Sequence, residues 1–335
     1  MIDQNKIDIL ENDIVNQYPD VLDILLRDHT TGKNIFWATN NYEGLGKEYS
    51  FKSAILPELI TGVNGHIIMP RVQKHMLLQR SRSTEMGEVF TPSWVCNAQN
   101  NLIDNAWFGK EGVFNISEGQ AWKTNKNNIT FPVGKTWKDY VKDTRLEIAC
   151  GEAPYITSRY DTTTGEFIPI ENRIGLLDRK LRVINENVHV SGKWLSAAQT
   201  AYKSTYAYEW QGDSLLLARE AMLITFIENY KQKFDKEPLL KSIKFIAYII
   251  SWNVWQMDGL KGVVPNSCGK IQKKIINLFG EIETDSSFCK GCLDDNIKKH
   301  NGDKCLIKDW SKKDVESGRK GRKIKFVDLI QNESF

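Results

Sequence analysis

Hydrophobic and polar positions alternate with two different periods between residues 84 and 266. Three short runs, at 145–149, 206–210 and 254–256, are strand-like. Between them lie longer segments with apolar residues at every third or fourth position, such as "RIGLLDRKLRVI" and "SLLLAREAMLITFIENY", which predict helices. Strands that alternate with helices predict a parallel sheet that binds its ligand at the carboxyl ends of the strands.

The regions on either side of this segment have other patterns. Residues 1–83 are expected to form an α+β extension, in which two apolar runs flank a hairpin turn at 30–33. We interpret Asp28 and Lys33 beside this turn as structural and not as nuclease residues. The segment 70–83 is basic, which indicates either phosphate contact or a solvated helix face. Its cations are Arg71, Lys74, Arg80 and Arg82.

Composition places the chain among globular proteins. It has 335 residues, of which 41% are apolar and 26% charged, and a net charge of +3 that says little about partners. The acidic N-terminus does not resemble a signal peptide, and the most apolar stretch, 245–255, is shorter than the roughly 20 residues that span a bilayer. We therefore expect a soluble, cytoplasmic protein without a membrane partner.

Polar residues gather at the ends of the three predicted strands. The first strand runs into Cys150-Gly151, where glycine would let the backbone approach a ligand closely. The second ends at Glu209, where an acid can accept hydrogen bonds from a ribose diol, and Asp258 follows the third. Each acid alone is more often a helix cap, but three in this order favour a site for a nucleoside-bearing cofactor.

These segments resemble the adenine-N6 DNA methyltransferases of restriction–modification systems. "LEIACGEAPY" resembles their motif I, "EMGEVFTPSWVCNAQ" their motif X, "AYEWQGDSLLLARE" motif II and "QMDGL" motif III. The resemblance covers about residues 84–260 in the order X, I, II, III. It implies a doubly wound, Rossmann-like core at 84–267 that binds S-adenosylmethionine, with double-stranded DNA as the substrate.

The resemblance also assigns roles to residues of this chain. Phe90, Thr91 and Pro92 would contact the methionine moiety, and Glu147, Cys150 and Gly151 would form the motif I loop. Glu209 would hold the ribose hydroxyls, Trp210 would pack on the adenine, and Asp258 would accept from its amino group. Ile148 and Ala153 depart from the family pattern, which usually has Pro and Gly there.

The catalytic Asn-Pro-Pro-Tyr motif of this family is missing from the sequence. None of the nine prolines is adjacent to another, and no target-recognition region follows motif III. Such enzymes flip the adenine out of the duplex and hold its amino group with that motif. Two interpretations remain. A second subunit could supply the motif and the target-recognition region, or the chain could be a degenerate, non-catalytic module that binds cofactor or DNA. We favour the first.

The region 268–335 contains a cysteine cluster followed by a basic tail. The spacing of Cys289, Cys292, His300 and Cys305 is typical of a structural zinc site, and Cys268 could replace one of these ligands. From residue 308 to 325 the tail has eight basic and three acidic residues, which indicates either contact with a phosphate backbone or a solvated segment. It leads into a final predicted strand before the chain ends.

Overall fold

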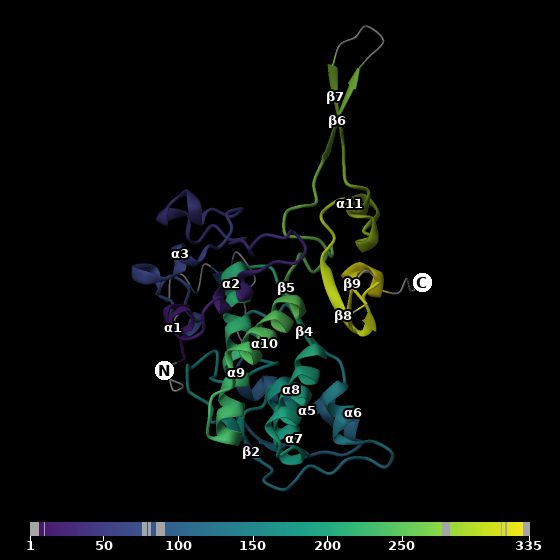
Figure 1. Ribbon diagram of the computed structural model, residues 1–335. Coiled ribbons are helices and arrows are strands. Elements are labelled where there is room, and N and C mark those ends of the chain that lie inside the picture. Colours follow the sequence, from purple (N-terminus) through teal and green to yellow (C-terminus); the bar gives the residue numbers. More distant parts are fainter. Residues whose placement is uncertain are drawn as a thin grey trace.

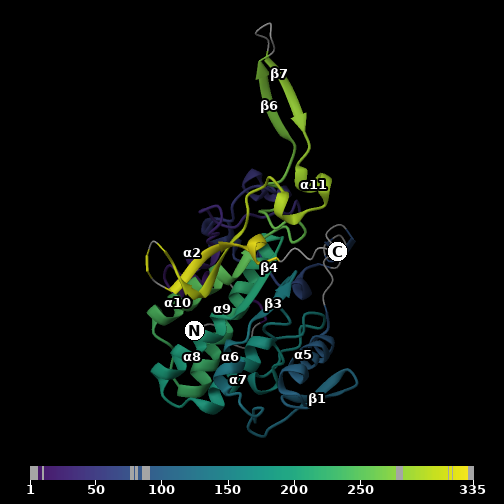
Figure 2. The ribbon, with the colours of Figure 1, turned by 90° about the vertical axis from the view of Figure 1, so that its right-hand side faces the viewer.

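Three short strands form a parallel sheet in the middle of the chain. In the computed structural model they are β3 (Arg145–Ile148), β4 (Thr205–Glu209) and β5 (Val254–Gln256), in the spatial order β3-β4-β5. Figure 1 labels β4 and β5, and Figure 2 labels β3 beside β4. Ile148 lies opposite Tyr208, and Glu209 lies opposite Gln256. The prediction of three parallel strands at these positions is confirmed, and the chain has mixed α/β structure.

The structure describes residues 7–9, 11–75, 79, 82–84, 91–276, 282–315, 317–318 and 320–330, without the side chains of 271–276 and 282–287. Helices α7 (Leu176–Asn187) and α8 (Ser191–Lys203) connect β3 to β4. Helices α9 (Gly212–Phe234) and α10 (Leu240–Asn253) connect β4 to β5. Every residue of α9 up to Tyr230 is buried, because the helix packs against the sheet, α10, α7 and the N-terminal helix α2 (Val21–Leu26).

The N-terminal extension is built from short helices and turns. Besides α2 it contains α1 (Glu11–Gln17) and α3 (Pro57–Ile60). The first arm of the predicted hairpin is helix α2 instead of a strand, and a single bridge between Arg27 and Asn34 closes the turn. In the described residues before α5, β-structure is limited to isolated bridges, because the chain packs α2 directly on α9 and α10.

The segment before β3 contributes helix α5 (Ser93–Phe108), the hairpin of β1 (Asn115–Glu118) and β2 (Ala121–Thr124), and helix α6 (Trp137–Lys142). Short 3-10 helices complete the described chain. They are η1 (Glu43–Leu45), η2 (Lys47–Tyr49), η3 (Gly62–Asn64), η4 (Arg71–Gln73), η5 (Ile170–Asn172), η6 (Ile297–Lys299) and η7 (Phe326–Leu329).

Two antiparallel hairpins dominate the C-terminal region. The first, β6 (Ile271–Ile276) with β7 (Ile282–Ser287), projects far from the body of the molecule (Figures 1 and 2). The second, β8 (Leu306–Lys313) with β9 (Lys320–Lys325), lies against α10, and the short helix α11 (Lys290–Asp294) separates the two hairpins. The described part of the predicted final strand is instead the end of β9 and the 3-10 helix η7, and residues 331–335 lie outside the described residues.

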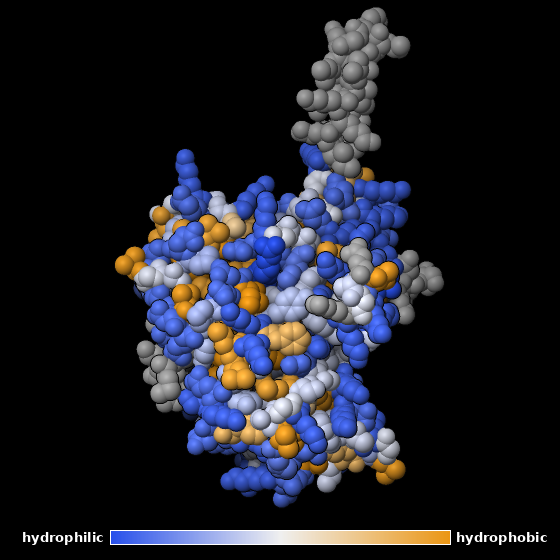
Figure 3. All heavy atoms as spheres, viewed as in Figure 1, coloured by the Kyte–Doolittle hydropathy of each residue, from blue (hydrophilic) through white to orange (hydrophobic). Residues whose placement is uncertain are grey.

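Two groups of buried apolar side chains form the interior. The larger one joins the helices, the sheet and the N-terminal extension, and the smaller one lies around Trp255, Met257 and Cys305. The face drawn in Figure 3 is largely hydrophilic, with apolar residues in small groups. In the described part of the chain, no helix combines the length and the apolar character needed to cross a bilayer.

Candidate functional site

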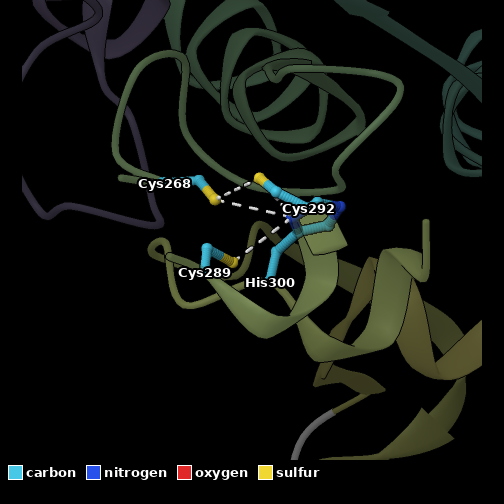
Figure 4. A group of neighbouring side chains, drawn as sticks. All are labelled: Cys268, Cys289, Cys292 and His300. Carbon is cyan, nitrogen blue, oxygen red and sulfur yellow. Dashed lines mark hydrogen bonds between the residues drawn. The ribbon is translucent and has the colours of Figure 1, made fainter. Parts of the chain in front are cut away.

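Four side chains with metal-ligating atoms converge at the base of the projecting hairpin. They are Cys268, Cys289, Cys292 and His300, and their ligand atoms all lie within 4.8 Å of one another (Figure 4). Cys268 precedes β6 and Cys289 follows β7, so the two legs of the hairpin meet at this group. The other two ligands come from α11 and from the turn after η6.

The distances within this group fit a tetrahedral zinc ion. The Sγ atoms of Cys268 and Cys292 are 3.6 Å apart, and the Nδ1 atom of His300 lies 3.4, 3.7 and 3.6 Å from the Sγ atoms of Cys268, Cys289 and Cys292. Zinc bonds of about 2.3 Å to sulfur and about 2.0 Å to nitrogen separate tetrahedral ligands by about 3.5 Å for a sulfur and a nitrogen and about 3.8 Å for two sulfurs. Three thiolates and one imidazole are also a preferred ligand set of structural zinc.

Cys268, the replacement ligand that the sequence analysis allowed, completes this group in place of Cys305. The sequence predicts Cys289, Cys292 and His300 correctly as neighbours, but Cys305 directly precedes β8 and lies in the smaller apolar core. Its thiol donates to the carbonyl of Gln256 at 3.4 Å, and its burial raises the pKa of the thiol well above the ordinary value. The hairpin β6–β7 reverses the chain and brings Cys268 to the position that the local spacing suggests for Cys305.

Tight backbone packing holds the metal-ligating residues in place. The backbone N–H of Asn301 donates to the Sγ atom of Cys289 at 3.3 Å, which supports a negative charge on sulfur. A side chain at Gly291 would overlap the backbone of His300, so this position requires glycine. The side chain of Asn301 also exchanges two hydrogen bonds with the backbone of Gly269, at 3.2 and 2.8 Å, and thereby ties the turn after η6 to Cys268.

A second cluster of functional candidates lies at the carboxyl ends of β3, β4 and β5. Backbone hydrogen bonds join these ends: the N–H of Cys150 donates to the carbonyl of Tyr208 at 2.9 Å, and the N–H of Met257 donates to the carbonyl of Glu209 at 2.9 Å. The structure therefore brings together the polar residues that the sequence places at three separate strand ends.

Glu209 stands at the end of β4 and contacts the loop after β3. Its Oε2 atom accepts the backbone N–H of Gly151 at 2.8 Å, and its Oε1 atom accepts those of Trp210 and Gln211 at 2.9 and 3.2 Å. These bonds fix the carboxylate between two strand ends. The indole of Trp210 is half-buried and donates to the carbonyl of Ala38 at 3.1 Å, so the N-terminal extension reaches this edge of the sheet.

Glu147 and Asp258 accept bonds from their own loops. Glu147 accepts the backbone N–H groups of Tyr155 and Ile156 at 3.3 and 3.1 Å, and burial raises its pKa well above the ordinary value. Asp258 accepts those of Leu260 and Lys261 at 3.1 and 3.2 Å. Both carboxylates thus shape the loops that follow β3 and β5.

Gly151 satisfies one requirement of a cofactor loop. Its φ of +52° lies in the left-handed region, and a Cβ atom built on it would meet no atom within 4 Å. The backbone is therefore open on this side, as close approach of a ligand requires. The neighbouring thiol of Cys150 is buried, and burial raises its pKa, which disfavours a nucleophilic role.

The predicted methionine-binding segment begins helix α5 beside this loop. The hydroxyl of Thr162 donates to the carbonyl of Thr91 at 3.1 Å, and the side chain of Asn100 donates to the carbonyl of Tyr155 at 3.0 Å. Pro92 precedes the first helical residue. Thr91 and Pro92 thus lie against the segment that follows Gly151, whereas Phe90 lies outside the described residues.

A buried ionic cluster beside Glu209 was missed by sequence reasoning. Asp213, in the first turn of α9, accepts bonds from Arg82, Lys74 and the hydroxyl of Tyr42 at 2.7, 3.0 and 2.8 Å. Both cations are buried, so neither solvent exposure nor phosphate contact describes these two members of the basic segment 70–83. The sequence signal that could have indicated this cluster is Asp213 itself, an acid in the first turn of a long apolar helix.

The turn at 30–33 has a structural explanation. The carboxylate of Asp28 accepts the backbone N–H groups of Thr30 and Thr31 at 3.2 and 2.9 Å, as expected for an acid that initiates a turn. These bonds support the interpretation of Asp28 as structural.

The chain was compared with known proteins at the level of family, sequence and structure. No family model, no curated protein and no solved structure matches it.

Proposed function

We propose that this chain is the S-adenosylmethionine-binding subunit of a DNA methyltransferase that modifies adenine N6 in a restriction–modification system. One observation carries the proposal: Glu147, Glu209 and Asp258 belong to the ends of three adjacent parallel strands, in the same order along the chain and across the sheet. Ligands of open α/β sheets bind at this edge. When bound, S-adenosylmethionine supplies an electrophilic methyl group.

The residues at this edge have chemistry that suits the proposed cofactor. The Glu209 carboxylate is held where ribose hydroxyls could donate to it, and the adjacent Trp210 ring offers an aromatic face to the adenine. Asp258 supplies a carboxylate near the other end of the edge, and the open side of Gly151 leaves room for the cofactor. Thr91 and Pro92 lie beside the same loop, which suits contact with the methionine moiety.

The edge of the sheet supports the idea of a partner subunit. Strand β3 pairs only with β4 among the described residues. Leu146 and Ile148 on β3 are 46% and 61% exposed, although parallel strands are normally buried on both faces. A parallel strand added to β3 would end beside Gly151. We propose that the partner supplies this strand together with the Asn-Pro-Pro-Tyr motif and the target-recognition region.

A second function class is favoured by a specific observation. All three acids accept backbone N–H bonds, and those of Glu147 and Asp258 come from their own loops, which is the usual structural role of such acids. A non-catalytic module that binds cofactor or DNA would keep this architecture without a catalytic partner.

Calorimetric titration of S-adenosylmethionine into the purified chain tests the cofactor site. We expect saturable binding with one site per chain, a loss of roughly tenfold or more in affinity for Glu209→Gln, and no change for Glu118→Gln, an exposed acid on β1. Circular dichroism would establish that both variants are folded. If the parent does not bind, or if Glu209→Gln binds like the parent, the cofactor proposal is wrong.

Methyl transfer to DNA by the chain together with a candidate second subunit tests the partner. The double variant Leu146→Arg/Ile148→Arg should keep cofactor binding and lose methyl transfer, because it places charge on the exposed face of β3, next to the edge where the partner would add its strand. Ile116→Arg, at a 59% exposed position on β1, is the matched control. Full activity of the double variant would contradict strand addition at β3.

We further propose that Cys268, Cys289, Cys292 and His300 hold a structural zinc ion. All four positions are filled by protein ligands, as in structural sites, which leaves no open position for a reacting water. Its role would be to join the two legs of the projecting hairpin to α11 and the turn after η6.

A further inference from the structure

A basic groove lies between the N-terminal extension and the C-terminal region. It has a volume of about 710 Å³. One wall comes from the turn at 30–33 and the segment around residue 52, and the other from the chain between the metal-ligating group and β8, with the end of β9. The residues that carry the argument are Thr30, Lys33, Lys52, Lys304, Leu306 and Lys325.

The charge of the groove is strongly one-sided. Its lining contains four lysines, and its only acidic residue is Asp303. Lys33, Lys52 and Lys325 are exposed, and none of the four lysines forms an ion pair with the part of the chain that the structure describes. Four cations that form no such ion pairs and outnumber the one acidic residue are a physical basis for binding a polyanion.

The two walls are joined by a direct hydrogen bond. The backbone N–H of Leu306 donates to the hydroxyl of Thr30 at 3.0 Å, and the carboxylate of Asp28 fixes the backbone of Thr30. On the other side, the backbone N–H of Phe326 donates to the carbonyl of Cys305 at 2.9 Å. The lysines therefore extend from a backbone whose geometry is set before any ligand arrives.

The metal-ligating group supports one wall of the groove. Gly302, which lines the groove, lies so close to Ser267 and Cys268 that a side chain there would overlap both. Lys304 follows two residues later, and its Nζ atom donates to the carbonyl of Ile297 at 3.0 Å. Loss of the metal would release the segment that carries Lys304.

We propose that this groove binds the phosphate backbone of double-stranded DNA. Lysines on two separate walls can contact several successive phosphates, which a small anion does not require. Such contacts position the duplex without reading its sequence, so a different part of the assembly would recognise the target site. The proposal rests on the proposed function in one respect, namely that DNA is the substrate.

Fluorescence anisotropy with a labelled 30-base-pair duplex, at salt concentrations between 50 and 200 mM, tests the groove. The triple variant Lys33→Gln/Lys52→Gln/Lys325→Gln removes exposed cations. We expect its affinity near 100 mM salt to fall by roughly 10²-fold, and the slope of log K against log salt to become less steep by about 3, because each phosphate contact contributes about 0.9.

The control triple variant is Lys123→Gln/Lys126→Gln/Lys241→Gln, which changes net charge equally at exposed positions outside the groove. It should retain the slope of the parent. The groove assignment is overturned if the parent does not bind the duplex, if the groove variant behaves like the parent, or if both triples lose binding equally. Cofactor titration separates the two proposals. If the parent does not bind S-adenosylmethionine, the cofactor site is refuted. The groove proposal still stands if the salt dependence of DNA binding differs between the parent and the groove variant.

Discussion

The guanidinium of Arg82 binds the carboxylate of Asp213 through two hydrogen bonds, of 2.7 and 3.2 Å, with both side chains fully buried. Arg82 precedes the α/β segment 84–266, and Asp213 lies in the first turn of helix α9, four residues after Glu209. Lys74 adds a second cation at 3.0 Å. This cluster ties the N-terminal extension to the helix that follows the second strand end.

Replacement of Asp213 by Asn should destabilise the fold strongly. The variant leaves two buried cations without a counter-charge, which costs about 3–5 kcal/mol of the free energy of unfolding. Urea denaturation of parent and variant measures this difference. Asp309→Asn, at a half-buried acid of β8 that pairs with Lys312, is the control and should cost less than about 1 kcal/mol.

The same cluster predicts a loss of stability in acid. Burial alone would raise the pKa of Asp213, but Arg82 and Lys74 outweigh burial and hold it well below the usual range. Because the folded pKa is depressed, the contribution is complete above the unfolded pKa of about 3.9 and is lost as pH falls through the folded pKa. The stability difference between parent and Asp213→Asn should therefore shrink below about pH 4. A difference that grows on acidification would contradict this explanation.

The four proposed metal ligands can be distinguished from Cys305 by substitution. Cys268→Ser should lose stoichiometric zinc, whereas Cys305→Ala should retain it, because Cys305 lies in the smaller apolar core. Zinc content of protein purified without chelator measures the first effect. Titration with cobalt adds a second readout, since the sulfur-to-cobalt charge-transfer absorption should match three thiolates in the parent and in Cys305→Ala. If Cys268→Ser retained zinc and Cys305→Ala lost it, the fourth ligand would be Cys305, as the spacing of the cysteines predicts.

Sequence spacing predicted only part of this group, for a physical reason. Cys289, Cys292 and His300 lie within one short stretch, so their proximity follows from local chain geometry. Cys268 is separated from Cys289 by a hairpin, and only the antiparallel pairing of β6 with β7 brings them together. Similarly, the sequence predicted phosphate contact or a solvated helix face for the segment of Lys74 and Arg82, because their partner Asp213 is distant in sequence.

The strand ends were more readily predicted. The period of apolar residues located β3, β4 and β5, and the residues directly after them followed from the strand boundaries. The pattern could not predict that backbone N–H groups donate to the carboxylates, because these bonds depend on how each loop turns back on its strand. The N-terminal extension was predicted less well, because α2 is set by tertiary packing on α9 and α10.

Two buried acids on α1 and α9 should make the protein less stable at alkaline pH. Among the described residues, the carboxylate oxygens of Glu11 and Glu220 have no hydrogen-bond partner. Burial raises the pKa of Glu11 to about 9 and raises that of Glu220 well above the ordinary value. A raised folded pKa gives stability that is complete below the unfolded pKa, about 4.3, and is lost as pH rises.

Glu220→Gln tests this pH dependence. The variant removes one ionisable group, so its free energy of unfolding should exceed that of the parent by about 1 kcal/mol or more at pH 8 and should fall less steeply between about pH 5 and 9. Urea denaturation at several pH values measures both quantities. Glu118→Gln, at an exposed position, should keep the pH dependence of the parent. If the free energy of unfolding changed with pH in the same way for Glu220→Gln and the parent, ionisation of Glu220 would not destabilise the fold.

The contact between the N-terminal extension and α9 depends on a glycine. The backbone N–H of Gly212 donates to the carbonyl of Trp37 at 3.0 Å, and a Cβ atom at this position would overlap the carbonyl of Phe36 and crowd Ile55. Gly212→Ala should therefore displace the segment 36–38 and cost about 1–3 kcal/mol of the free energy of unfolding. Gly192→Ala in α8 is the matched control, since its Cβ atom would meet nothing within 4 Å and alanine favours a helix by up to about 1 kcal/mol.

Limited proteolysis would locate the effect, with faster cleavage near residues 36–38 in Gly212→Ala alone. Because Trp210 donates to Ala38 in the same segment, Gly212→Ala should also weaken cofactor binding if the extension closes the proposed site. Equal stability of the two glycine variants would contradict the close approach of these backbones.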